Sequence, residues 1–221
     1  MGLTRAALGA VFIWTTGVAA PPGAESAEPV SIPAVAIEMA RLPATSFTLM
    51  QRELETLIGG ADLRVRWRRD SPAAETAADE LRVVFLDGPG RGLYAGRPVL
   101  AASRHTDPGP TIWVYTPSVL AAWGPTAGGR DSPDRQRALG LALGRVLAHE
   151  LVNVLAPEMP HGHGVMADRF RLVALEQTRP ALVPACARAL VQGARDWATR
   201  GGRTLRQEAS AGASHLSDTR P

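Results

Sequence analysis

The chain has 221 residues, which is enough for one domain with a substantial core and short for two. Hydrophobic residues make up 45% of the chain and charged residues 20%, an ordinary balance for a globular protein. The net charge is only +3 and the basic residues, all of them arginine, are scattered along the sequence, so we expect no nucleic-acid partner.

The N-terminus has the pattern of a secretory signal peptide. A short positive start at residues 1–5 precedes an apolar run at residues 6–20 and then small residues, with Gly17-Val18-Ala19 as one cleavage site. The alternative is a membrane anchor, but that run is shorter than the ~20 residues that a spanning helix needs. We therefore expect a signal peptide at residues 1–24 and a secreted or periplasmic bacterial protein with no stable membrane insertion after cleavage. Residues 25–40 are expected to form a flexible leader.

The first half of the predicted domain is one helix followed by strands. Apolar residues at helical spacing predict a helix over Thr45–Ile58, which Gly59-Gly60 ends. Strict alternation predicts a strand at Leu63–Trp67, with the arginines at positions 64, 66 and 68 on its solvated face. Further strands are expected at residues 81–86, 98–103 and 111–115, separated by Gly- and Pro-containing turns.

The second half is mainly helical. After a loop at residues 123–129, Ser132 as N-cap and Pro133 at the first position predict a long helix that ends at Leu155. Shorter helices are expected at residues 169–177 and 184–197, the second holding the single cysteine, Cys186, as a buried apolar residue. The fold class is α+β, a small twisted mixed sheet packed on the long helix, with one domain at residues 41–200 and a disordered tail at 201–221.

A cluster of histidines at the end of the long helix carries the candidate chemistry. His149-Glu150 lies in the helix, with Asn153 one turn later, and His161 and His163 follow within the next loop. Histidines at positions i and i+4 of a helix share one face and bind one metal, and a glutamate between them can act as general base. Here the i+4 position holds asparagine.

The segment from residue 143 to residue 167 resembles the zincins, and more narrowly the metzincin-like secreted bacterial metalloproteases. The resemblance rests on the His-Glu helix, a later histidine and a Gly-Val-Met turn that ends at Met166. It implies a Zn²⁺ site and a peptide or protein substrate, hydrolysed by a metal-bound water with Glu150 as general base. Met166 would then form an apolar floor beneath the metal, unless it is only a core residue.

Two departures from the family pattern leave alternatives open. The metal ligands would be His149, His161 and either Asn153, through its amide oxygen, or His163 from the loop; the third histidine also comes later than in the usual spacing. The chain could instead be a catalytically inactive zincin-fold module that binds a peptide or partner, or a metal-binding protein without peptide contact. The sequence does not determine the oligomeric state.

Two other features remain outside the cluster. Trp113 and Tyr115 lie on a strand that could edge a substrate cleft and pair with an extended peptide, although we favour ordinary strand aromatics. His105 sits beside a turn and is expected to be exposed.

Overall fold

The structure is a computed structural model that describes residues 28–70, 77, 79–91, 98–106, 109–123, 129, 132–162, 164–166 and 182–216. Its helices are α1 (Ala44–Ile58), α2 (Thr116–Trp123), α3 (Pro133–Leu155) and α4 (Pro184–Leu216), with 3-10 turns η1 (Gly59–Ala61) and η2 (Gly164–Met166). Its strands are β1 (Val30–Glu38), β2 (Leu63–Asp70), β3 (Leu81–Leu86), β4 (Gly90–Arg91), β5 (Pro98–Val99), β6 (Ala101–His105) and β7 (Pro110–Tyr115). The predicted signal peptide, the predicted helix at residues 169–177 and His163 lie outside the described residues.

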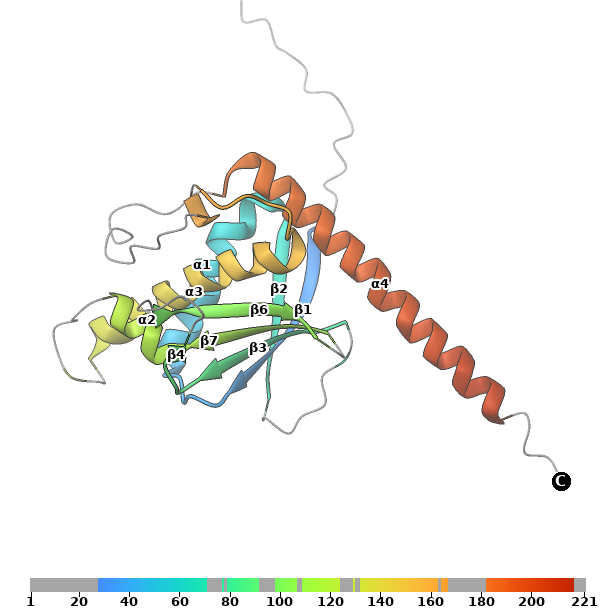
Figure 1. Cartoon of the computed structure of the whole chain (residues 1–221), viewed down its shortest axis with the longest axis horizontal. Coiled ribbons are helices and arrows are strands. Elements are labelled where there is room, and N and C mark those ends of the chain that lie inside the picture. The colour runs from blue at the N-terminus through green and yellow to red at the C-terminus, as the bar shows by residue number, and fades with distance from the viewer. Residues whose placement is uncertain are drawn as a thin grey trace, which may run out of the picture.

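A five-stranded mixed sheet forms the centre of the molecule, in the order β2-β1-β3-β7-β6. Strands β2, β1, β3 and β7 are parallel to one another, and β6 is antiparallel to β7 at the edge. Helices α1 and α3 lie side by side over the sheet, and α3 contacts both β7 and β6 (Figure 1). The predicted α+β class, with a mixed sheet packed on a long helix, is therefore confirmed.

The prediction of a flexible leader at residues 25–40 is wrong for most of that segment. Residues 30–38 form β1, which is hydrogen-bonded between β2 and β3 in the interior of the sheet. Ile32, Ala34 and Ala36 face the main core, whereas Val35 and Ile37 belong to a smaller cluster on the other side. Because both faces are buried, the strand lacks the alternation of polar and apolar residues that marks a half-exposed strand.

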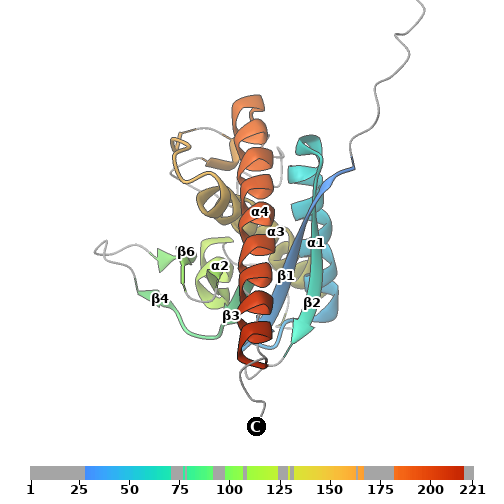
Figure 2. The same cartoon turned by 90° about the vertical axis from the view of Figure 1, so that its right-hand side faces the viewer.

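The C-terminal prediction also needs correction, because α4 continues to Leu216 where a disordered tail was expected from residue 201. Figure 2 shows this helix running past α1 and α3, and Figure 1 shows its last turns extending beyond the sheet. Helix α2, between β7 and the predicted loop, was not anticipated.

Helix α3 begins and ends as the sequence predicts. The Ser132 hydroxyl accepts a hydrogen bond from the backbone N–H of Arg135 at 3.2 Å, Pro133 occupies the first turn, and the helix ends at Leu155. By length and mean hydropathy α3 could cross a membrane, but 83% of its most apolar window is buried inside the protein. Burial in the core of this fold therefore explains the apolar composition of α3.

Two glycines let α1 approach α3 closely. A Cβ atom on Gly140 would lie 2.6 Å from the Cβ of Leu49, and one on Gly144 would lie 2.8 Å from the backbone oxygen of Met50. These distances are too short for a side chain, so the two backbones are nearly in contact. About one and a half turns beyond Gly144, α3 reaches His149 and Glu150, so the crossing with α1 helps to fix the position of the candidate site.

Helix α4 makes a similar close approach at the other end of α3. Gly193 lies against the carbonyl of Leu155, where a Cβ atom would overlap the oxygen. On the same helix, Cys186 is only 1% exposed, as expected, and burial raises the pKa of its thiol.

Because the thiolate is the reactive form, we expect Cys186 to react with a disulfide reagent only after denaturation. Absorbance of the released chromophore in native buffer and in urea measures this. The matched control is Val183→Cys in the Cys186→Ala background, which places a thiol at a position that is 40% exposed and should react at once. Equally rapid labelling of both thiols in native buffer would contradict the packing of α4.

Candidate functional site

The loop after α3 folds back against the helix beside His149. The backbone N–H of Gly162 donates to the carbonyl oxygen of Met166 at 2.7 Å, and Gly164 has a left-handed backbone with φ of 60°. Glycine adopts that conformation readily because it has no Cβ atom. Val165 and Met166 are buried at the base of this turn, so the Gly-Val-Met segment is part of the core.

The turn orients the ring of His149. Its Nδ1 lies 2.9 Å from the carbonyl oxygen of Val165. A carbonyl oxygen only accepts, so Nδ1 must carry the proton, and in the neutral ring Nε2 then carries the lone pair. A backbone carbonyl that fixes the tautomer in this way is the usual arrangement behind a metal-binding histidine.

His161 comes from the loop and lies beside His149. The two ring centroids are 5.2 Å apart, and the ring planes are tilted by 46°. Two imidazoles that each bind a tetrahedral zinc through one nitrogen at ~2.0–2.1 Å would have their centroids ~5 Å apart. The two histidines that the sequence singled out are thus brought together at a spacing that suits one shared metal.

Glu150 is buried, with 8% of its surface exposed, and two side chains hold its carboxylate. The hydroxyl of Ser103, on β6, donates to Oε2 at 2.6 Å, and the Asn153 amide nitrogen donates to the same oxygen at 3.3 Å. Because a carboxylate only accepts, the nitrogen of the Asn153 amide must be the atom that faces Glu150. The amide oxygen is then left for a different partner.

The described residues do not complete a metal site by themselves. Within the ranges that the structure covers, no group of three or more His, Cys, Asp or Glu side chains could hold a metal ion. The third ligand would therefore be Asn153, through its amide oxygen, or His163, which lies outside the described residues. Asn153 and His163 are the same two alternatives for this ligand that the sequence presents.

Strand β6 runs along α3, and two of its side chains make polar contacts with the helix. Ser103 meets Glu150, and two residues later the exposed His105 has its Nε2 3.2 Å from the carbonyl oxygen of Val154, one helical turn beyond Glu150. Residues i and i+2 of a strand lie on the same face, so this face of β6 follows the helix. The exposure predicted for His105 is confirmed.

The edge of the sheet beside α3 is β6, and this argues against the alternative role that the sequence left open for Trp113 and Tyr115. Trp113 and Tyr115 lie on β7, which is paired on one side with β3 and on the other with β6. Neither residue is on an edge strand, so β7 cannot pair with an extended peptide, and the reading of both as ordinary strand aromatics is the better one.

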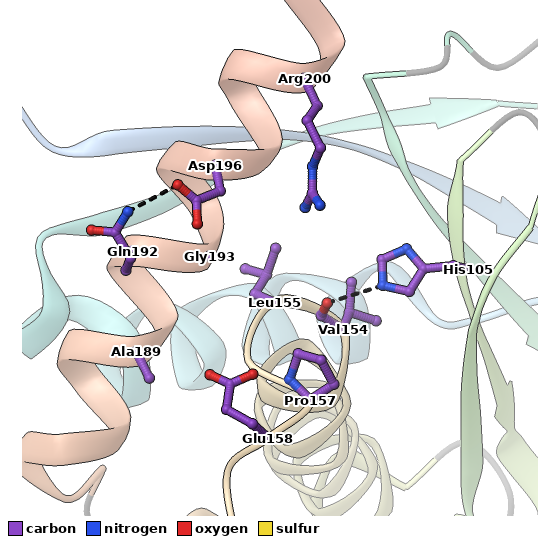
Figure 3. Close-up of a pocket in the computed structure, with 10 residues that line it drawn as sticks. All are labelled: His105, Val154, Leu155, Pro157, Glu158, Ala189, Gln192, Gly193, Asp196 and Arg200. Carbon is purple, nitrogen blue, oxygen red and sulfur yellow. Dashed lines mark hydrogen bonds between the residues drawn. The ribbon is translucent and has the colours of Figure 1, made fainter.

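A cavity of about 360 Å³ lies beyond the end of α3, between α3, β6 and α4 (Figure 3). Its polar lining includes His105, Glu158, Asp196 and Arg200. Its described lining does not include His149, Glu150 or His161, so these three residues lie outside the cavity.

Sequence reasoning missed Ser103, which is 47 residues from Glu150 along the chain. The sequence placed Ser103 on a predicted strand but could not place that strand beside α3, because the contact depends on the order of strands in the sheet.

No protein-family model, curated protein or solved structure matches this chain, so its function has to be inferred from the arrangement of its own residues.

Proposed function

We propose that this chain is an exported zinc-dependent metallopeptidase that hydrolyses peptide bonds, with Glu150 as general base. The observation that carries the proposal is the pair of imidazoles of His149 and His161. They come from α3 and the following loop and have their centroids 5.2 Å apart, with the tautomer of one ring set by the Val165 carbonyl. The buried carboxylate of Glu150, the residue next to His149, adds the general base that hydrolysis needs.

The residues present fit zinc as far as they are described. His149 and His161 would supply two nitrogen ligands, and Asn153 or His163 would supply a third. Zinc, when bound, polarises a carbonyl and lowers the pKa of water. Glu150 would accept the proton of the attacking water, and Ser103 and Asn153 hold its Oε2.

An extended peptide substrate could pair with the edge strand β6, which lies beside α3. β6 is the last strand in the order, so among the described strands its outer edge has no partner. A peptide that added to this edge would lie beside α3 and close to Glu150, because Ser103 of β6 contacts that carboxylate.

A second candidate is a catalytically inactive module of the same fold that binds a peptide or partner. Asn153 favours it, because a neutral amide is a weaker zinc ligand than imidazole and here its nitrogen is engaged by Glu150. In this alternative the edge of β6 binds a peptide without cleaving it.

Metal content and hydrolysis of an unfolded protein, measured on the same preparations, test the proposal. We expect stoichiometric zinc in the native chain and in Glu150→Gln, and loss of zinc in His149→Ala and His161→Ala. Hydrolysis should fall by ~10²–10⁴-fold in Glu150→Gln, the usual contribution of a general base.

Two matched controls lie outside the cluster. His105→Ala removes an exposed histidine and should keep zinc, and Glu158→Gln changes an exposed glutamate just beyond α3 and should keep both zinc and activity. If the native chain contains no zinc after zinc loading, the metal site is wrong. If zinc is bound but hydrolysis is absent, the inactive module becomes the better description. Hydrolysis that is unchanged in Glu150→Gln would show that Glu150 is not the general base.

A further inference from the structure

Ser103 makes the shortest hydrogen bond to the proposed catalytic carboxylate. Its hydroxyl lies 2.6 Å from Oε2 of Glu150, whereas the Asn153 amide nitrogen lies 3.3 Å from the same atom. The two donors come from different elements, one from β6 and one from α3 itself. The carboxylate is therefore held from two directions, and of these two donors Ser103 is the one that belongs to the sheet.

The hydrogen bond from Ser103 affects the orientation of the Glu150 carboxylate as well as the stability of the fold. The terminal torsion of a glutamate is broad, so a carboxylate held only by its own helix can rotate. β6 is also the edge strand along which an extended peptide would lie. One strand would thus hold both the substrate and the carboxylate, and would fix the distance between them.

We propose that Ser103 is a positioning residue that sets the orientation of the Glu150 carboxylate relative to the edge strand. The effect on rate rests on the proposed function, whereas the coupling between the two side chains does not. A small misplacement of a reacting group can reduce a rate by ~100-fold, so loss of this hydroxyl should reduce kcat.

The first test measures the coupling in metal-free protein by a double-mutant cycle. Urea midpoints are compared for the native chain, Ser103→Ala, Glu150→Gln and the double variant. If the hydroxyl holds the carboxylate, the shift in the double variant is clearly different from the sum of the two single shifts. Additive shifts would overturn the proposal, whatever the peptidase activity of the chain.

The second test separates positioning from packing by kinetics on the zinc-loaded protein. Ser103→Ala is expected to lower kcat by ~10- to 100-fold, with KM and zinc content nearly unchanged. Ser103→Thr keeps a hydroxyl on a residue that suits a strand, and it should restore kcat to within a few-fold of the native value. A matched strand control, Arg64→Ala, changes an exposed residue of β2 at the opposite edge of the sheet and should leave kcat as it is.

The outcomes distinguish the two proposals. Coupled shifts together with a lower kcat that threonine restores support the role of Ser103. An unchanged kcat in Ser103→Ala, or a loss that threonine does not restore, overturns it even if the chain is a peptidase. If the native chain is inactive but the shifts are coupled, the proposed function fails while the hold of Ser103 on Glu150 is supported.

Discussion

Replacing Asn153 with histidine is expected to tighten zinc binding by at least ~10- to 100-fold and to raise peptidase activity. Residue 153 is one helical turn after His149, where a second imidazole shares the same face of α3. Groups outside the first coordination shell already change metal affinity by ~10–100-fold, so exchanging a neutral amide for an imidazole should do no less. Competition with a chelating dye measures the affinity, and hydrolysis of an unfolded protein measures the activity.

A companion variant shows which residue completes the site in the native chain. Asn153→Leu removes the amide while keeping a similar size and a good helix former. If the amide oxygen is a ligand, this variant loses zinc affinity and His163→Ala does not; if His163 is the ligand, the pattern reverses. Zinc affinity that stays constant in Asn153→His would show that side chain 153 does not reach the metal.

Breaking the buried ion pair between α1 and α3 should give the largest loss of stability. The Nε of Arg145 donates to Oε1 of Glu53 at 2.7 Å, and the two side chains are only 4% and 2% exposed. Arg145→Met leaves the Glu53 carboxylate buried without its main partner, which typically costs 3–5 kcal/mol in the free energy of unfolding. Urea unfolding followed by circular dichroism measures the change.

The double variant Arg145→Met/Glu53→Leu tests whether the loss comes from the orphaned charge. Because apolar residues of similar volume often replace a buried pair at little cost, most of the lost stability should return. As an exposed control, Arg68→Met breaks the pairing of that arginine with Glu80 and should cost ~1 kcal/mol or less. An Arg145→Met variant as stable as the native chain would show that this pair does not hold α1 on α3.

The parts of the fold that the sequence predicts well are those with a strong local pattern. Helix α3 has an N-cap serine, a proline in its first turn and prolines after its end, and its bounds agree with the prediction. Strand β2 has strict alternation and shows one buried and one exposed face, with arginine on the exposed side. In both elements a local rule and the tertiary structure favour the same conformation.

The parts that sequence reasoning missed depend on contacts between distant segments. Strand β1 has an apolar stretch that contains a proline and follows a proline-rich segment, and it becomes recognisable only between its neighbours in the sheet. The same holds for the site. His149 and His161 are close in sequence and were identified, whereas Ser103 reaches Glu150 only because β6 ends the strand order beside α3.

The three close approaches to α3 affect how mutational tolerance should be interpreted in this protein. Gly140 and Gly144 lie against α1, and Gly193 of α4 lies against the last residue of α3. None of them has a side chain that could bind or react, yet a methyl group at any of the three would displace the helix that carries His149. A scan of substitutions scored by activity would thus mark these glycines as strongly as the site itself, and only a parallel measurement of folding would separate the two groups.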